Sequence, residues 1–576
     1  MNAIPVVTKK SSSSPHGGGV RGAELSRRSS QFEGRFGRMF RSLPAAEWPV
    51  DALLKLGAQM TSPPELDPKD SKKPGAAFED PAKVIQDDEE NSGIPAGYTY
   101  LGQFIDHDIT FDPASSLQKQ NDVDGLVDFR TPRLDLDSLY GRGPGDQPYM
   151  YDDNKFRLGA ELFEGFKGKK SRARDLPRYA GNGSESLPLR ALIGDKRNDE
   201  NVIVSQLHSA MLQFHNKLVD VMPKNTAFAE VQRMVRWHYQ WVVVNDFLVK
   251  LCGKEVVHDI LPNVGKNLPA WQFKPQLHFY QHKNDAFMPI EFAAAAYRFG
   301  HSMVRPIYRL NTELNGGDDP TAATPDEVKA GIAGRFFIFA GVQNRGLNGF
   351  DAFPNQWAID WSLYFDINGS GKLSGKKRAQ PSYKIDTSLV NPLGFLPEFS
   401  NVVPASPPLT LAQLQAAPKD PQNNPAGLAQ RNLMRGMAMA LPSGQDVARA
   451  MGLTPVSDAN LRIGKAVIAD WDDPKTPNMA TFEKGVFAGK APLWYYILAE
   501  AQYEWALRAK KAGSRGNEEP VTLGSVGKRI VAETLIGLLL ADGHSYLRQA
   551  PNWTPKDAGH VGADFDMGKL IQFALS

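Results

Sequence analysis

Four short segments of the sequence bring ionisable side chains together at spacings that could support chemistry. The first holds Gln103, Asp106, His107 and Asp108. A helical period of 3.6 residues puts the first three on one face and turns Asp108 away from it. Because a histidine flanked by two aspartates is costly to bury without partners, this segment is either exposed or faces a ligand on one side and a cation on the other.

The second segment runs from Thr131 to Ser138 and offers oxygen atoms at alternate positions. Thr131, Asp135 and Asp137 carry side-chain oxygens, and a hard cation takes six to eight oxygen ligands. Asp108 of the first segment could complete the set. A solvated acidic loop is the competing interpretation, and it is the better one for this segment taken alone.

The third segment, residues 194–201, leads into a long helix with periodic apolar residues. Arg197 and Glu200 are predicted to share a face near the start of that helix, where a surface salt bridge is the simplest interpretation. His208 and His215 lie seven residues apart on the same helix. Ordinary helix packing explains both of them, so we assign neither a ligand.

The fourth segment is Tyr297-Arg298-Phe299-Gly300-His301, inside a predicted helix that follows a run of four alanines. Gly300 would let a flat and bulky group approach the backbone. A lone histidine in such a helix is usually a core residue whose hydrogen bonds are satisfied. By itself this segment therefore does not establish a binding site.

Long helical patterns dominate the chain that must position these segments. Strand signals are few and short, such as Arg335 to Ala340, and there is no βαβ alternation and no repeat of fixed period. The fold class is therefore mainly α, with few short strands and long loops, including the proline-rich residues 403–427. The predicted helices cover Val202 to Val221, Phe228 to Leu251, Ile290 to Val304, Leu428 to Ala440, Leu493 to Ala512 and Val526 to Ala541.

Composition narrows the possible functions. The 576 residues include 66 Lys and Arg against 64 Asp and Glu, and this balance argues against nucleic acid as a partner. A hydrophobic fraction of 41% allows a core large enough to enclose a sizeable cofactor. The single cysteine, Cys252, excludes an intramolecular disulfide and is predicted to be a buried, inert thiol.

The first ninety residues are predicted to be an N-terminal extension, basic at its start and then Pro-rich and acidic. Apolar residues between Phe32 and Phe40 occur at near-helical spacing, which favours packing onto the main body over a role as a membrane or polyanion arm. The N-terminus has no apolar signal-peptide core, and Ile530 to Ala541 is too short to span a bilayer.

Taken together and in this order, the four segments resemble the peroxidase-cyclooxygenase superfamily, the animal-type haem peroxidases, and particularly its disulfide-poor bacterial members. The resemblance runs from about Gly97 to the C-terminal segment Leu538 to Gln549. It implies one large helical haem peroxidase domain over residues 91–576, built around a buried haem b.

The resemblance also implies the residues on the proximal side of the haem. His301 matches the iron ligand, and a peroxidase needs the second nitrogen of that imidazole held by a partner. Asn432 matches the family's residue for that role. Arg298 and Arg435 match the partners of the haem propionates.

On the distal side, the resemblance makes His107 the acid-base that takes a proton from hydrogen peroxide and returns it to the leaving oxygen. Arg197 would stabilise the developing negative charge, and Gln103 matches a residue that lines the halide site. Asp106 and Glu200 match the carboxylates that form ester bonds to haem methyl groups.

For the second segment, the resemblance implies that the cation is calcium. Asp108, Thr131, Asp135 and Asp137 match the family's calcium ligands, together with the carbonyl of Arg133. Some relatives use serine where this chain has Asp137. Because Asp108 adjoins the distal histidine, the resemblance implies that loss of the ion would displace that histidine.

The function implied is that of a haem peroxidase, an enzyme that reduces hydrogen peroxide through a ferryl intermediate and oxidises bromide, iodide, thiocyanate or small aromatic donors. Some relatives form a further haem link through a methionine where this chain has Asn201, so chloride is a less favoured donor. Consumption of hydrogen peroxide connects such an enzyme with the response to oxidative stress.

Two alternative functions stay open. A fatty-acid dioxygenase or cyclooxygenase needs a radical-forming tyrosine three residues before the proximal histidine, but this chain has Arg298 there, and Tyr297 lies about 100° round the helix. A non-catalytic haem-binding scaffold is the second alternative, and the intact His107, Arg197 and His301 weigh against it. A plain helical scaffold without haem would make the four segments a coincidence.

The partners we expect are hydrogen peroxide and a halide, thiocyanate or small organic electron donor, with no nucleic acid and no transmembrane segment. We also expect a monomer. The lack of a signal peptide and of disulfides favours a bacterial protein that is cytoplasmic or non-classically secreted.

Overall fold

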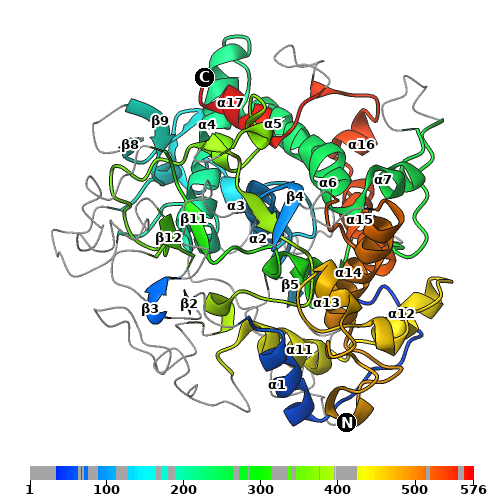
Figure 1. The fold of residues 1–576 in the computed structure, drawn as a ribbon. Coiled ribbons are helices and arrows are strands. Elements are labelled where there is room, and N and C mark those ends of the chain that lie inside the picture. The colour runs from blue at the N-terminus through cyan, green and yellow to red at the C-terminus, as the bar shows by residue number, and fades with distance from the viewer. Residues whose placement is uncertain are drawn as a thin grey trace, which may run out of the picture.

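Helices dominate the structure, which confirms the mainly α class predicted from the sequence (Figure 1). One cluster of buried apolar residues extends through the molecule and links the helices with the short strands. The computed structural model describes residues 34–62, 66–67, 70–74, 89–111, 127–128, 130–163, 170–179, 189–263, 272–282, 285–312, 335–338, 346–374, 377–394, 396, 425–513, 519–555 and 564–576.

All but one of the predicted helices form where the apolar periodicity places them. The longer ones in the described part are α1 (Val50–Gln59), α2 (Gly97–Ile109), α4 (Val202–Val221), α5 (Phe228–Val242), α11 (Leu428–Ala438), α14 (Leu493–Lys511), α15 (Ser525–Ala541) and α17 (Met567–Ala574). Shorter ones are α3 (Asp137–Tyr140), α6 (Leu248–Cys252), α7 (Lys254–Ile260), α8 (Ile290–Ala293), α12 (Gly444–Ala450), α13 (Ile468–Asp472) and α16 (Tyr546–Gln549).

The strands are short and pair in small sheets. A three-stranded sheet has the order β10-β1-β5, and the other described sheets are two-stranded, with the orders β11-β12, β13-β4, β2-β3, β6-β7 and β8-β9. Their bounds are β1 (Gly34–Gly37), β2 (Leu66–Asp67), β3 (Asp70–Pro74), β4 (Glu90–Pro95), β5 (Val127–Asp128), β6 (Tyr151–Asp152), β7 (Lys155–Phe156), β8 (Glu161–Phe163), β9 (Lys170–Arg174), β10 (Met288–Pro289), β11 (Ile307–Arg309), β12 (Arg335–Phe337) and β13 (Pro381–Tyr383).

Helix α4 packs against α2, α5 and α17. Asn201 caps it, because its side-chain oxygen accepts a hydrogen bond from the backbone N–H of Ile203 at 2.9 Å. All residues from Val202 to His215 are buried. The predicted helix from Phe228 to Leu251 is also present, as α5 and α6 joined by a π-helical turn at Val243–Phe247.

The prediction of one helix from Ile290 to Val304 is wrong. Helix α8 stops at Ala293, Ala295 leaves the helical region at φ −136° and ψ −73°, and a 3-10 helix follows over Ala296–His301. Arg298 Nε donates to the carbonyl oxygen of Ala293 at 3.0 Å and so satisfies the end of α8. The run of alanines favours a helix locally, but this tertiary arrangement overrides that preference.

Residues 34–62 pack onto the main body. Phe36, Met39 and Phe40 are buried in the core, and helix α1 packs on α11. Glu291 fixes this segment, because its carboxylate accepts hydrogen bonds from the backbone N–H groups of Met39 and Phe40, each at 3.0 Å. Phe32 and most of residues 63–88 lie outside the described residues, and a boundary at residue 90 stays a prediction.

Other sequence predictions can be placed as well. Cys252 is buried, and burial raises the pKa of its thiol far above the ordinary value, which agrees with an inert cysteine. Most of the proline-rich stretch 403–427 lies outside the described residues, and so do Phe339 and Ala340 of the predicted strand. Within the part of the chain that the structure describes, no helix combines the length and the apolar character that crossing a membrane requires.

Candidate functional site

The first and third sequence segments meet in the structure. Helix α2 presents Gln103 and His107 towards Glu200, which follows a 3-10 helix at Lys196–Asp199. Gln103 Nε2 donates a short hydrogen bond to Glu200 Oε1, and the same oxygen lies 3.8 Å from His107 Nε2. Asp106 lies on α2 beside them and accepts a hydrogen bond from the hydroxyl of Thr110 at 3.0 Å.

Arg197 is held next to His107 by a carboxylate that the sequence analysis did not single out. Asp195 accepts from Arg197 Nε at 3.2 Å and from Nη2 at 2.8 Å. Arg197 Nη2 also donates to the carbonyl oxygen of His107 at 2.9 Å, and the guanidinium lies 4.7 Å from the ring centre of Phe111. Arg197 and Glu200 precede α4 rather than lying on it, and the ion pair of Arg197 is with Asp195.

Electrostatic effects keep Asp195 charged and His107 uncharged. Burial alone would raise the pKa of Asp195, but hydrogen bonds from Arg197 and the charges of Arg197 and Arg130 lower it well below its usual range. Burial, assisted by the charge of Arg197, lowers the pKa of His107 to about 4. At neutral pH His107 is therefore an uncharged imidazole beside a fixed cation.

The fourth segment is joined to a distant part of the chain. His301 ends the 3-10 helix Ala296–His301, and its Nδ1 lies 2.8 Å from Asn432 Nδ2 of α11. Arg298 Nη1 donates to Asn432 Oδ1 at 2.9 Å. Arg435 is one turn further along α11. Burial, together with the charge of Arg298, lowers the pKa of His301 to about 3, so this imidazole is neutral as well.

The two histidine segments are neighbours in space. Tyr297 is buried, and its hydroxyl donates to the carbonyl oxygen of Gly102 on α2 at 3.2 Å. The 3-10 helix that ends at His301 therefore packs against the helix that carries His107. Because this helix is a 3-10 helix, Tyr297 lies about 120° round the axis from position 298, instead of the rotation of about 100° expected for an α-helix.

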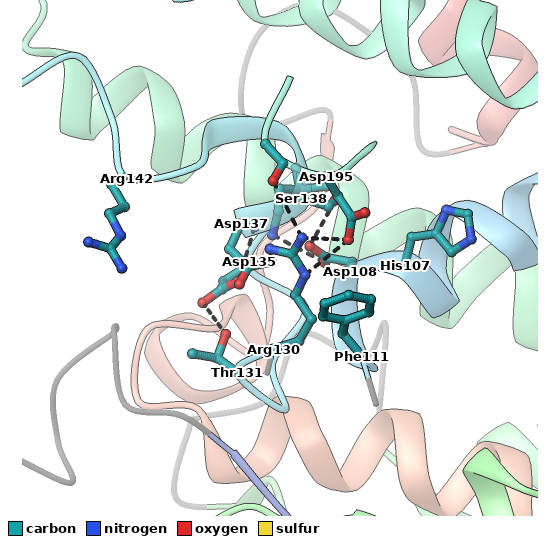
Figure 2. A network of polar contacts seen from close by, with 12 residues as sticks. His107, Asp108, Phe111, Arg130, Thr131, Asp135, Asp137, Ser138, Arg142 and Asp195 are labelled. Atoms are coloured by element: carbon teal, nitrogen blue, oxygen red, sulfur yellow. Dashed lines mark hydrogen bonds and ion pairs between the residues drawn. The ribbon is translucent and has the colours of Figure 1, made fainter. Parts of the chain in front are cut away.

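The second segment and Asp108 form an acidic cluster in which Asp108 and Asp135 are buried and Asp137 is partly buried. One carboxylate oxygen each from Asp108, Asp135 and Asp137 lies within 4.8 Å of the others. Asp108 is fully buried, whereas His107 points away from the cluster, as the helical period predicts (Figure 2). Thr131 Oγ1 donates to Asp135 Oδ2 at 3.1 Å, and Ser138 Oγ donates to Asp108 Oδ1 at 3.3 Å.

The cluster has the charge properties of a cation site. Burial and the charges of the other two carboxylates raise the pKa of Asp108 well above its usual range. Burial also raises the pKa of Asp135, and it raises the pKa of Asp137 to about 7 despite the nearby Arg130. Three carboxylates placed this way repel one another unless a cation or protons neutralise them. Arg133 lies in the same loop, where its backbone N–H donates to the carbonyl oxygen of Thr131 at 2.7 Å.

Arg130 connects the acidic cluster with the side chain that holds Arg197. Its Nη1 lies 3.2 Å from Asp137 Oδ1, and its Nε donates to Asp195 Oδ2 at 3.1 Å (Figure 2). Asp195 is thus shared by two arginines, one facing the cluster and the other facing His107. Arg130 directly precedes Thr131 and Asp195 lies within the third segment, but neither residue was predicted from the sequence to take part in the site.

The comparisons with known proteins agree with this geometry. The model of the animal haem peroxidase family matches residues 125–328, a span that contains the acidic loop, Arg197, Glu200 and His301. This part of the chain is similar to the animal haem peroxidase family, and that similarity implies a haem cofactor.

Among its relatives, thyroid peroxidase from Rattus norvegicus is 24% identical over 226 residues, which cover 36% of this chain and 22% of that protein. A peroxidase-like protein from Margaritifera margaritifera is 24% identical over 258 residues, covering 36% of this chain and 32% of the relative. The matches thus span a third or less of these relatives. Peroxidase A from Dictyostelium discoideum has the same fold, with a TM-score of 0.50 and 14% identity over 95% of this chain and 94% of that one.

The residues around His301 fit a haem group. His301 Nε2 has no hydrogen-bond partner in the described part of the chain, and its neutral imidazole suits a metal ligand. A Cβ placed on Gly300 would meet no atom within 4 Å, so there is room beside the backbone at this point. Arg298 supplies positive charge beside Asn432, and Arg435 lies one turn along the same helix as Asn432.

One adjustment is needed for that fit. Iron at Nε2 requires the proton of His301 to be on Nδ1, and only the oxygen of the Asn432 amide can accept it. In this structure that oxygen accepts from Arg298, and the amide nitrogen faces His301. A haem held through Nε2 would therefore use the other orientation of the Asn432 amide, with Oδ1 towards His301.

Proposed function

We propose that this chain is a haem-dependent peroxidase that uses hydrogen peroxide to oxidise bromide, iodide, thiocyanate or small aromatic donors. The observation that carries the proposal is the pairing of two neutral histidines from distant segments. One of them, His301, has no hydrogen-bond partner at Nε2 among the described residues, and the other, His107, lies beside Arg197. Haem b, when bound through His301, supplies the iron at which the O–O bond of peroxide is cleaved.

The chain's own residues would handle the proton and the charge. His107 Nδ1 is engaged by Asn198 Oδ1 at 2.8 Å, so Nε2 is the nitrogen that can take the proton from peroxide and return it to the leaving oxygen. Arg197, fixed by Asp195, stabilises the negative charge that develops on that oxygen. Gln103 lies on the same face of α2 and would line the donor site.

Two covalent links to the haem are part of the proposal. Asp106 and Glu200 are partly buried carboxylates at this site, and we expect ester bonds from one or both of them after reaction with peroxide. Acid-acetone treatment after turnover should then leave haem attached to the chain. Complete extraction of the haem would contradict the links without affecting the proposed activity.

We also propose that the acidic cluster binds calcium. Asp108, Thr131, Asp135 and Asp137 would supply side-chain oxygens, together with the carbonyl of Arg133. Support comes from the three clustered carboxylates, two of them buried, whose mutual repulsion a divalent cation would relieve. The ion would also hold Asp108 in place, next to His107.

The peroxidase proposal is tested with the full-length chain loaded with hemin. We expect peroxide-dependent oxidation of guaiacol, iodide, bromide and thiocyanate, with chloride the poorest donor because Asn201 serves as a helix cap rather than a haem link. Oxygen uptake with linoleate is measured on the same sample. Oxygen uptake without peroxide-dependent donor oxidation would favour a dioxygenase, and neither activity would favour a non-catalytic haem scaffold.

A further inference from the structure

A chain of three buried side chains leads away from the distal histidine into the core. His107 Nδ1 lies 2.8 Å from Asn198 Oδ1, and Asn198 Nδ2 lies 3.0 Å from His208 Nδ1. The three residues belong to α2, to the 3-10 helix Lys196–Asp199 and to α4. Asn198 and His208 are fully buried, and His107 is 5% exposed.

The chemistry of an amide fixes where the protons lie in this chain. The amide oxygen can only accept a hydrogen bond, and the amide nitrogen can only donate one. With Asn198 Oδ1 facing His107, the proton of His107 is on Nδ1 and the lone pair is on Nε2. With Asn198 Nδ2 facing His208, the proton of His208 is on its Nε2.

That proton on His208 has no partner. His208 Nε2 is buried and makes no hydrogen bond within the described part of the chain, and the ring packs edge-on against Phe104 at 6.0 Å between ring centres. Burying an unpaired N–H is unfavourable, so packing alone does not account for a histidine at this position. The hydrogen bond that Nδ1 of His208 accepts from Asn198 does account for it.

We propose that Asn198 and His208 are positioning residues that set the tautomer of His107. His208 offers an acceptor to the Asn198 amide nitrogen, and this turns the amide oxygen towards His107. The oxygen holds the proton of His107 on Nδ1 and leaves Nε2 as the free base. A reversed amide would put the proton on Nε2 and remove the base from the site. The catalytic meaning of this arrangement rests on the proposed peroxidase function, but the arrangement itself does not.

The tautomer is measured directly by NMR on the full-length chain with ¹⁵N-labelled histidine, without added haem. The His107 signals are assigned by their loss in His107→Ala. We expect a protonated Nδ1 and an unprotonated Nε2 at neutral pH. A proton on Nε2 of His107 in the unmodified chain would overturn the proposal, and this result would not depend on whether the chain binds haem.

Variants test each link of the chain. In Asn198→Leu and His208→Phe we expect the proton of His107 to shift towards Nε2, and the rate of reaction of the hemin-loaded protein with peroxide to fall about tenfold. Asn198→Asp keeps an acceptor and should keep the proton on Nδ1. His215→Phe is the matched control, because His215 is buried on the same helix but bonds to Tyr140 and Asn154.

The outcomes separate positioning from a merely structural role. An unchanged tautomer in both Asn198→Leu and His208→Phe would overturn the proposal even if the peroxide rate falls. If Asn198→Leu does not fold, His208→Phe and the tautomer of the unmodified chain decide. A shifted tautomer in a chain that shows no peroxidase activity would support the positioning role and contradict the proposed function.

Discussion

At the scale of single residues, the site depends on contacts that fix one atom at a time. Arg197 is held by Asp195, and His107 is kept neutral by burial and by the charge of Arg197. The sequence indicated His107 and Arg197 because their types and order are distinctive. Asp195 and Asn198 could not be distinguished from other polar residues nearby, since their importance lies in which atoms face each other after folding.

Replacing His107 with alanine removes the proposed acid-base while leaving His301 in place. General acid-base catalysis contributes about 10²- to 10⁴-fold, so we expect His107→Ala to lose at least about 10²-fold in its rate of reaction with peroxide. Stopped-flow mixing of the hemin-loaded protein with peroxide measures this rate. The exposed His258 provides a matched control, and an undiminished rate in His107→Ala would refute the role.

At the scale of elements, most helices could be predicted from apolar periodicity, because that pattern reflects a buried face. The segment from Ile290 to Val304 could not, since Arg298 and the turn at Ala295 depend on the surrounding fold. The packing of α1 on α11 could not be predicted from the sequence either, although it affects the geometry of the site. Helix α11 carries Asn432, and its position determines where the partner of His301 lies.

Gly57 of α1 offers a test of this packing. A Cβ at Gly57 would lie 2.6 Å from the backbone nitrogen of Gln430, which is far too close, so α11 would have to move. We expect Gly57→Ala to weaken hemin affinity severalfold by displacing Asn432. The measurement is a hemin titration with Gly145→Ala as control, because a Cβ at Gly145 meets no atom within 4 Å. Equal affinities in the two variants would contradict this coupling.

At the scale of the whole molecule, segments far apart in sequence depend on one another. The N-terminal residues 34–62 complete the core, and the acidic loop reaches Arg197 through Arg130 and Asp195. The order of the four segments along the chain indicated one domain with one site. Sequence could not show that Arg130 links the cation cluster to the distal arginine, because that link joins two segments that are about sixty residues apart in the chain.

Removal of the cation should lower the stability of the whole protein in a pH-dependent way. The pKa of Asp137 is raised from 3.8 to about 7 by burial, so the cation-free folded state binds more protons than the unfolded state. Without the cation, the Asp137 carboxylate therefore destabilises the folded protein least below about pH 4. The free energy of unfolding falls as pH rises from there towards 7. Calcium at 100 times its Kd should restore about 2.7 kcal/mol.

Thermal unfolding in EDTA and in calcium, followed at several values between pH 5 and pH 8, measures this effect. The difference in Tm between the two conditions should grow with pH. Replacing Asp135 and Asp137 together with asparagine should abolish the difference. Equal Tm values in EDTA and calcium across this range would count against a cation at the cluster.

The most direct test of the central claim is a hemin titration of the full-length chain followed by its Soret absorption. The account predicts a sharp Soret band that saturates with hemin in the unmodified chain and in His258→Ala. In His301→Ala the band should be lost or strongly shifted, because the iron has no imidazole ligand there. A folded, unmodified chain that shows no Soret band, or a His301→Ala variant with an identical one, would contradict the account.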